Sequence, residues 1–243
     1  MYKHLLASGC SFTFDSWNWP TFVAQDLNIE LSNVGMGSMG NTLIARRAIT
    51  KLNELLEVYN PEDILVGIMW SGENRYHRFV GDTPIETHNQ RLIGNPTYMW
   101  PNGEKVWEIS NNHWDTEFNK NYLKYIHTFE DSFMSTIDSI ILTQNYFKSL
   151  GVDYFMCSFI ELFKYIYSAH SDVKKYSKLI DYSKFADIGG CFEWCRDNQI
   201  NFEYTGEFED KEWVHPLEEG HKAFAKNVIL PFITKNKTNN STI

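Results

Sequence analysis

Short apolar runs and amphipathic stretches alternate along the first 71 residues of the chain. Nearly continuous apolar runs bounded by glycine or polar residues predict buried strands, whereas apolar positions at helical spacing predict helices. On this basis we expect strands over residues 2–8, 29–34 and 63–71, and helices over residues 16–27 and 42–59. Such an order with short links is typical of parallel strands joined by right-handed crossovers.

The alternation stops after the third predicted strand, where the chain becomes rich in Asn, Gly, Pro and aromatic residues. In this region Trp100-Pro101-Asn102-Gly103-Glu104 lies between Tyr98-Met99 and Val106-Trp107, which is a hairpin pattern. We therefore expect an aromatic-rich insertion over residues 75–115, above the carboxyl edge of the sheet.

The second half of the chain returns to helix and strand patterns. We expect a long helix over residues 117–150, broken near His127 and ended by Gly151, and a fourth strand over residues 152–158. Residues 160–181 fit no single pattern. The remaining expected elements are a helix over 184–198, a weak fifth strand over 200–204, an acidic loop over 205–214, a helix over 218–233 and a polar tail over 235–243. We interpret residues 1–234 as a single α/β domain.

Charge and composition narrow the classes of function. The chain has 22 Lys and Arg against 31 Asp and Glu, and this balance disfavours a nucleic-acid surface, because phosphate binding needs clustered cations. No apolar run has the length of a membrane span, and the N-terminal residues lack the apolar core of a signal peptide. The four cysteines do not form a disulfide framework. We expect a cytoplasmic protein that acts on a small molecule or a carbohydrate, without a nucleic-acid or membrane partner.

Four segments with reactive or turn-forming residues follow the predicted strands. Ser11 comes after the first strand, Gly37-Ser38 after the second, Asn74 after the third, and Glu212 to His215 after the fifth. Parallel sheets bind ligands at the carboxyl ends of their strands, where loops and helix N-termini offer unpaired N–H groups. We therefore expect these segments to meet at one edge of the sheet.

The residue types in these segments suit a nucleophilic mechanism. The Ser11 hydroxyl needs a base to take its proton, and the base needs an acid that holds it in the correct tautomer. We expect His215 Nε2 to be that base, with Glu212 accepting from Nδ1. The candidate donors to an oxyanion are the backbone N–H groups of Ser11 and of Gly37 or Ser38, and the side-chain amide of Asn74.

Together these segments resemble the sequence blocks of the SGNH (GDSL-type) hydrolases, a family of esterases and acetylesterases. The matching segments are Gly9-Cys10-Ser11-Phe12, Asn33 to Asn41, Gly72-Glu73-Asn74, and Glu212 to His215 with Pro216 and Gly220-His221. The resemblance implies a three-layer flavodoxin-like α/β fold with a parallel five-stranded sheet in the order 2-1-3-4-5, and no cofactor. It also implies that Ser11 is the nucleophile and His215 the base, with Asn74 and a glycine-block amide as oxyanion donors.

Three positions depart from the family pattern. Cys10 stands where the family usually has Asp, and Ser38 stands where it usually has glycine, so that Gly37 remains an alternative donor. The acid is Glu212 rather than Asp, and Asp210 or a backbone carbonyl are alternatives for orienting the histidine.

Other side chains allow both functional and structural interpretations. Arg75 follows the candidate oxyanion donor and, with His77 and Arg78, would favour an acidic or carboxylated substrate. A surface ion pair between Arg75 and Glu73 explains the same residue equally well. The tryptophans of this region would form either a sugar-stacking wall or the small core of the insertion. These tryptophans are Trp70, Trp100, Trp107 and Trp114.

We interpret several remaining reactive side chains as structural. Cys10 fits a small buried hydrophobic residue better than a nucleophile, because no separate basic partner for it is apparent. His221 would lie on the last helix. Cys191 and Cys195 are one helical turn apart, but no further Cys or His pair has the spacing of a metal site, so we expect no metal.

The sequence thus predicts a serine esterase that hydrolyses a small acyl ester, such as an acetyl group on a carbohydrate, through a Ser11 acyl-enzyme. The alternative is a catalytically silent domain of the same fold that binds a glycan or a protein through the aromatic insertion. Reaction of Ser11 with a serine-directed reagent separates the two hypotheses.

Overall fold

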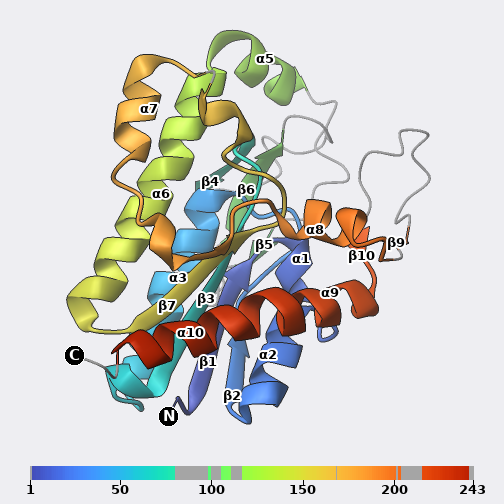
Figure 1. The fold of residues 1–243 in the computed structure, drawn as a ribbon. Coiled ribbons are helices and arrows are strands. Elements are labelled where there is room, and N and C mark those ends of the chain that lie inside the picture. Colours follow the sequence, from blue (N-terminus) through green and yellow to red (C-terminus); the bar gives the residue numbers. More distant parts are fainter. Residues whose placement is uncertain are drawn as a thin grey trace.

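The computed structural model describes residues 2–79, 98–99, 105–110, 117–167, 169–200, 202–203 and 215–240. Five parallel strands form its central sheet: β1 (His4–Gly9), β2 (Glu30–Asn33), β3 (Ile64–Trp70), β7 (Asp153–Ser158) and β8 (Phe185–Asp187). Their order across the sheet is β2-β1-β3-β7-β8 (Figure 1). Numbered along the chain this is the order 2-1-3-4-5, which confirms the predicted topology.

Strands β1 and β3 lie inside this sheet, and every residue of both is buried. Strands covered on both faces must be largely apolar, which is why these runs are conspicuous in the sequence. Their register pairs His4 with Ile64 and Gly9 with Met69. Both strands therefore end close together, at the same edge of the sheet.

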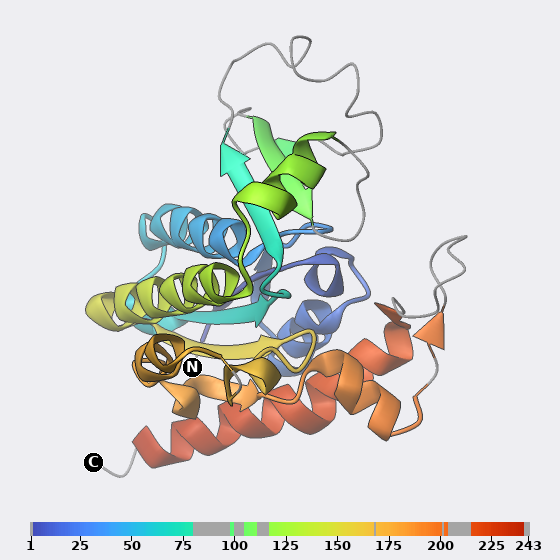
Figure 2. The ribbon, with the colours of Figure 1, turned by 90° about the horizontal axis from the view of Figure 1, so that it is seen from above.

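Helices cover both faces of the sheet, as Figure 2 shows from above. On one face α3 (Asn41–Leu56) packs against α6 (Phe129–Leu150). The other face carries α2 (Trp19–Leu27), α8 (Cys191–Asp197) and the C-terminal helix. That last helix consists of α9 (Glu218–Phe224), the π-helical η4 (Ala225–Ile229) and α10 (Leu230–Asn240). The fold is the expected three-layer α/β arrangement.

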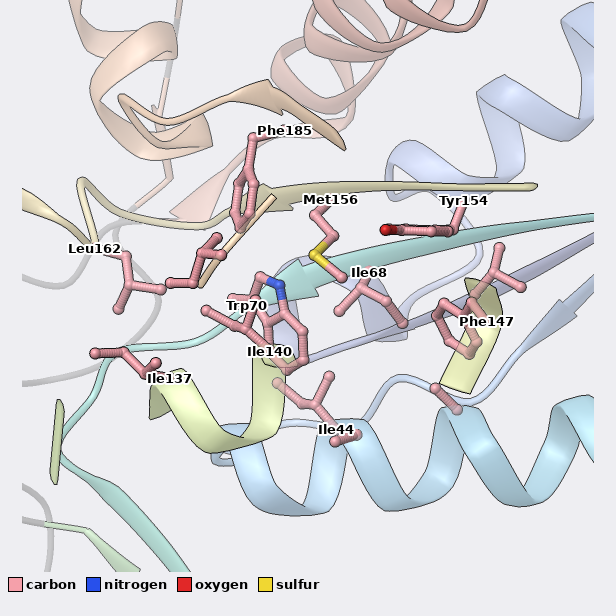
Figure 3. Close-up of a cluster of buried hydrophobic side chains, with 14 of the residues drawn as sticks. Ile44, Ile68, Trp70, Ile137, Ile140, Phe147, Tyr154, Met156, Leu162 and Phe185 are labelled. Atoms are coloured by element: carbon pink, nitrogen blue, oxygen red, sulfur yellow. The ribbon is translucent and has the colours of Figure 1, made fainter. Parts of the chain in front are cut away.

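One hydrophobic core fills the space between the sheet and the α3–α6 layer (Figure 3). Ile44 of α3 and Ile140 of α6 belong to it, together with Ile68 and Trp70 of β3 and Met156 of β7. None of these five side chains has measurable exposure. Burying a large apolar side chain contributes ~1.5–3 kcal/mol, so this core anchors the two central strands.

The remaining elements outside the insertion are short. They are α1 (Ser11–Phe14), η1 (Pro61–Asp63), α5 (Glu117–Tyr125), η2 (Lys164–Tyr167), α7 (Ser171–Ser177), η3 (Tyr182–Lys184) and the antiparallel pair β9 (Phe202–Glu203) and β10 (His215–Pro216). The gap between α5 and α6 confirms the predicted break near His127. Gly151 ends α6 in the left-handed conformation, with φ of 69°, which confirms the predicted cap.

The insertion after β3 contains a small antiparallel sheet. Its strands are β4 (Arg75–Phe79), β5 (Tyr98–Met99) and β6 (Lys105–Ser110), in the order β4-β6-β5. Tyr98 pairs with Val106, which confirms the predicted hairpin. In Figure 2 this sheet projects beyond the helices of the main body.

The predicted position of the fifth strand is wrong. Residues 185–187, expected at the start of a helix, form β8, and that helix is limited to α8. Residues 202–203 lie outside the main sheet and pair with β10. A three-residue strand is too short to display an alternating pattern, and Gly189-Gly190 separates it from the helix that follows.

Two other boundaries differ from the predictions. The helix expected over residues 16–27 begins at Trp19, with Pro20 in its first turn, and α1 precedes it. Trp17, which falls within the expected range, lies before the helix and is exposed. At the other end α10 reaches Asn240, within the predicted polar tail.

Two further predictions concern the acidic loop and the extent of the domain. The acidic loop at residues 205–214 lies outside the described residues, and the assignment of residues 1–234 to a single domain stays a prediction. Among the described helices, none is long and apolar enough to cross a membrane.

Two glycines with positive φ provide a matched test of the packing. Gly190 has φ of 92° and Gly151 has φ of 69°. A Cβ at Gly190 would lie 2.3 Å from the Ile160 carbonyl carbon, whereas a Cβ at Gly151 meets nothing within 4 Å. We expect Gly151→Ala to lower the free energy of unfolding by about 1–2 kcal/mol through backbone strain alone. Gly190→Ala should cost more, as measured by chemical denaturation, and equal losses would contradict this packing.

Candidate active site

Ser11 is the first residue of α1 and stands directly beyond the carboxyl end of β1. The turn is tight, because a Cβ at Gly9 would lie only 2.9 Å from the Met69 carbonyl oxygen and closer still to Thr13. The Asn18 side-chain amide donates to the Ser11 carbonyl oxygen at 2.8 Å. Ser11 is partly buried, on a backbone held by these contacts.

His215 meets Ser11 across this edge of the sheet. Ser11 Oγ lies 2.7 Å from His215 Nε2, although the two residues are 204 positions apart in the chain. The imidazole belongs to β10 and is partly buried. A hydroxyl and an imidazole nitrogen at this distance are placed for direct proton transfer.

Aromatic rings support the imidazole. The Phe12 ring lies beside it, with ring centroids 4.7 Å apart. The Phe12 ring in turn lies 4.9 Å from the Phe159 ring and 5.9 Å from the His221 ring, measured between centroids. His221 is fully buried, and within the described part of the chain neither of its ring nitrogens has a hydrogen-bond partner. Burial lowers the pKa of His221 to about 3, so it is neutral and serves as packing, consistent with a structural role.

The pKa of His215 is lowered from its usual 6.5. Burial is the main cause, the positive charge of Arg75 acts in the same direction, and the carboxylate of Asp15 opposes both. The imidazole is therefore neutral near pH 7, which is the form that accepts a proton.

The glycine-rich turn after β2 is fixed against β1. The N–H groups of Val34 and Met36 donate to the carbonyl oxygens of Ala7 and Gly9, at 2.8 and 3.1 Å. Asn33 ties this turn to α1, since its side chain accepts from the Gly35 N–H and donates to the Thr13 carbonyl oxygen. The Gly37-Ser38 turn, in which Ser38 has φ of 60°, is thereby held at the edge where Ser11 lies.

The loop after β3 is fixed by Asn41, the first residue of α3. The Asn41 side chain accepts from the Ser71 N–H at 2.7 Å and donates to the Ser71 carbonyl oxygen at 3.0 Å. Asn74, three residues later, is partly buried, and its Oδ1 lies 3.3 Å from where a Gly72 Cβ would be. The third candidate segment thus also leaves the sheet at this edge.

Arg75 does not make the alternative ion pair with Glu73. Burial raises the pKa of the Glu73 carboxyl, and no carboxylate among the described residues lies within ion-pair distance of Arg75. Its guanidinium carbon instead lies 5.1 Å from the centre of the Phe159 ring. Next to it His77 Nδ1 accepts from the Gly40 N–H at 3.0 Å, so that β4 is attached to the start of α3.

Other predicted site residues are absent from this cluster or lie outside the described residues. Trp70 is fully buried in the core, because strand alternation places it on the same face as Ile68, and it offers no surface to a ligand. Cys10 is also fully buried, as expected for a small hydrophobic residue. The residues outside the described ranges are Trp100, Trp114, Asp210 and Glu212.

The four cysteines are all free and buried. Within the described ranges, no three His, Cys, Asp or Glu side chains come together in an arrangement that would hold a metal ion.

Sequence reasoning missed the residues that hold the site together. Asn41 and His77 bond to backbone groups 30 and 37 positions away, and Asn18 bonds to a carbonyl seven positions before it. Asn41 stood within a recognised block, and His77 was considered only for substrate charge. The available signal was an Asn or His beside a predicted turn, a place where such side chains often satisfy free backbone groups.

Comparisons with known proteins return only distant structural likenesses. No family model and no curated protein matches the chain. A member of the lipolytic G-D-S-L family from Veillonella parvula is 13% identical with a TM-score of 0.43, over 92% of this chain and 94% of its own. The acetyl xylan esterase AlAXEase is 14% identical with a TM-score of 0.41, over 92% and 96%. The esterase EstA from Pseudoalteromonas sp. is 10% identical with a TM-score of 0.40, over 97% and 99%.

Proposed function

We propose that this protein is a serine ester hydrolase in which Ser11 forms an acyl-enzyme. The observation that carries the proposal is the 2.7 Å contact between Ser11 Oγ and the Nε2 of a neutral, partly buried His215. A serine becomes a strong nucleophile when such a base accepts its proton. The sequence resemblance to esterases and acetylesterases favours a small acyl group, such as acetyl on a carbohydrate, as the substrate.

The first half of the reaction acylates the serine. Ser11 Oγ attacks the ester carbonyl carbon while its proton moves to His215 Nε2. The carbonyl oxygen becomes an oxyanion, for which we assign the N–H groups of Ser11 and of Gly37 or Ser38 and the amide of Asn74 as donors. When the intermediate collapses, the alcohol leaves with the proton from His215.

The second half releases the acid. Water attacks the acyl carbonyl and gives a proton to His215, the bond to Ser11 Oγ breaks, and the proton returns to that oxygen. Glu212 is our first assignment for the group that orients His215, with Asp210 or a backbone carbonyl as alternatives. The acid is thus proposed from the sequence, whereas the nucleophile and base are supported by their contact.

Substitution of the nucleophile and the base tests this assignment. We expect Ser11→Ala and His215→Ala each to lower kcat for 4-nitrophenyl acetate by roughly 10⁴–10⁶-fold, since the two groups act as a unit. Cys10→Ala, which removes a buried thiol, and Ser16→Ala, which removes an exposed hydroxyl from the neighbouring loop, should retain most activity. Retained activity in Ser11→Ala, or its loss in Cys10→Ala with intact folding, would contradict the mechanism.

The oxyanion assignment predicts a separate effect. Asn74→Ala should lower kcat by about 10²–10³-fold with little change in KM, because the amide bonds most strongly to the charged intermediate. Asn227→Ala, on an exposed position of η4, is the matched control. A change confined to KM would mean that Asn74 binds substrate rather than stabilising the oxyanion.

The pH dependence follows from the charge state of His215. Its neutral form is the base, and its pKa is lowered, so kcat/KM should rise with pH through a midpoint below 6.5 and then level off. Besides burial, two charged groups among the described residues act on this midpoint: Arg75 lowers the pKa and Asp15 raises it. We expect the Asp15→Asn midpoint to move to lower pH, and a shift in the opposite direction would contradict the assignment.

A further inference from the structure

The guanidinium of Arg75 packs on the group of aromatic rings that also contacts His215. The Nη1 nitrogen of Arg75 is buried and has no hydrogen-bond partner among the residues that the structure describes. Within the described part of the chain no carboxylate forms an ion pair with this guanidinium. Burying a charged donor without an acceptor is unfavourable, so an anionic group that accepts a hydrogen bond from this nitrogen would remove that cost.

The backbone of Arg75 is fixed relative to the site. A Cβ at Gly40 would lie 2.4 Å from the Arg75 carbonyl oxygen, which shows how closely β4 approaches the start of α3. His77, two residues further along β4, accepts from the Gly40 N–H. The guanidinium therefore extends from a rigid strand rather than from a long loop.

A row of aromatic rings connects Arg75 with Ser11 and His215. The guanidinium carbon lies 5.1 Å from the Phe159 ring centre, and the Phe159 ring lies 4.9 Å from that of Phe12. Phe12 follows Ser11 in the chain and packs against His215. The charge of Arg75 is felt at His215, where it lowers the pKa. The guanidinium and the Ser11–His215 pair therefore belong to the same end of the sheet and share the Phe12–Phe159 ring contact.

We propose that the substrate carries a carboxylate, in its acyl or its alcohol part, and that Arg75 binds this carboxylate next to the reacting ester. This inference rests on the proposed hydrolase function and specifies its substrate class. Guanidinium groups bind carboxylates through paired hydrogen bonds, which would satisfy the buried nitrogen. In a chain with net charge −9, a local cation at the site also offsets the general repulsion of an anionic substrate.

Two pairs of esters test the proposal and locate the carboxylate. The acyl pair is 4-nitrophenyl butyrate and 4-nitrophenyl hydrogen succinate, and the alcohol pair is phenyl acetate and 4-acetoxybenzoate. We expect the wild-type protein to prefer the carboxylated member of one pair. Arg75→Gln should lower kcat/KM for that member by roughly 10–100-fold, the usual worth of hydrogen bonds to a charged group, and leave its neutral partner nearly unchanged.

Two further variants separate binding from other effects of the charge. Arg75→Lys keeps the charge without the paired donors and should retain part of the preference. Arg46→Gln removes one positive charge from an exposed position of α3 and should leave the preference intact. Assays at about pH 8 keep His215 neutral in every variant, so that a changed pKa does not contribute.

The outcomes distinguish this inference from the proposed function. Turnover without a preference for either carboxylated ester, or an equal loss on both members of a pair in Arg75→Gln, would overturn the role of Arg75 and leave the hydrolase proposal standing. Failure of the wild-type protein to hydrolyse any of the four esters would overturn both.

Discussion

The structure depends on the parallel arrangement of β1 and β3. Because parallel strands end on the same side, their outgoing loops all reach one edge, and the antiparallel β9–β10 pair brings a C-terminal histidine to the same place. The buried apolar residues of β1 and β3 fix the positions from which these loops leave the sheet. The contact between Ser11 and His215, from opposite ends of the chain, is a consequence of this topology.

Polar side chains, rather than regular structure, fix the loops at that edge. Asn18, Asn33 and Asn41 each bond to backbone groups of a neighbouring turn, and His77 does the same at the N-terminus of α3. Each of these bonds satisfies a backbone group where a strand ladder or a helix has ended. The cost of ordering these loops is therefore met on folding, before any substrate binds, which is what a preorganised site requires.

The sequence was most informative where patterns were long. Periodicity or turn chemistry predicts the buried strands β1, β3 and β7, the helix α3, the break before α6, and the hairpin at Tyr98 and Val106. The position of the fifth strand could not be predicted in this way, because three residues are too few to show an alternating pattern. The burial of Trp70 could have been predicted, because alternation along β3 points its side chain into the core. Its aromatic character instead suggested a ligand-binding surface. Contacts such as His77 with Gly40 join residues by tertiary packing alone, so no local pattern reports them.

The central claim is that the Ser11 hydroxyl is activated by His215. A fluorophosphonate reagent reports this directly, because it forms a stable adduct with an activated serine and needs no knowledge of the substrate. Peptide mapping by mass spectrometry should place one phosphonyl group on the peptide containing Ser11 in the wild-type protein and in Cys10→Ala, and none in His215→Ala. An unmodified Ser11 in the folded wild-type protein, or equal labelling without His215, would contradict the account.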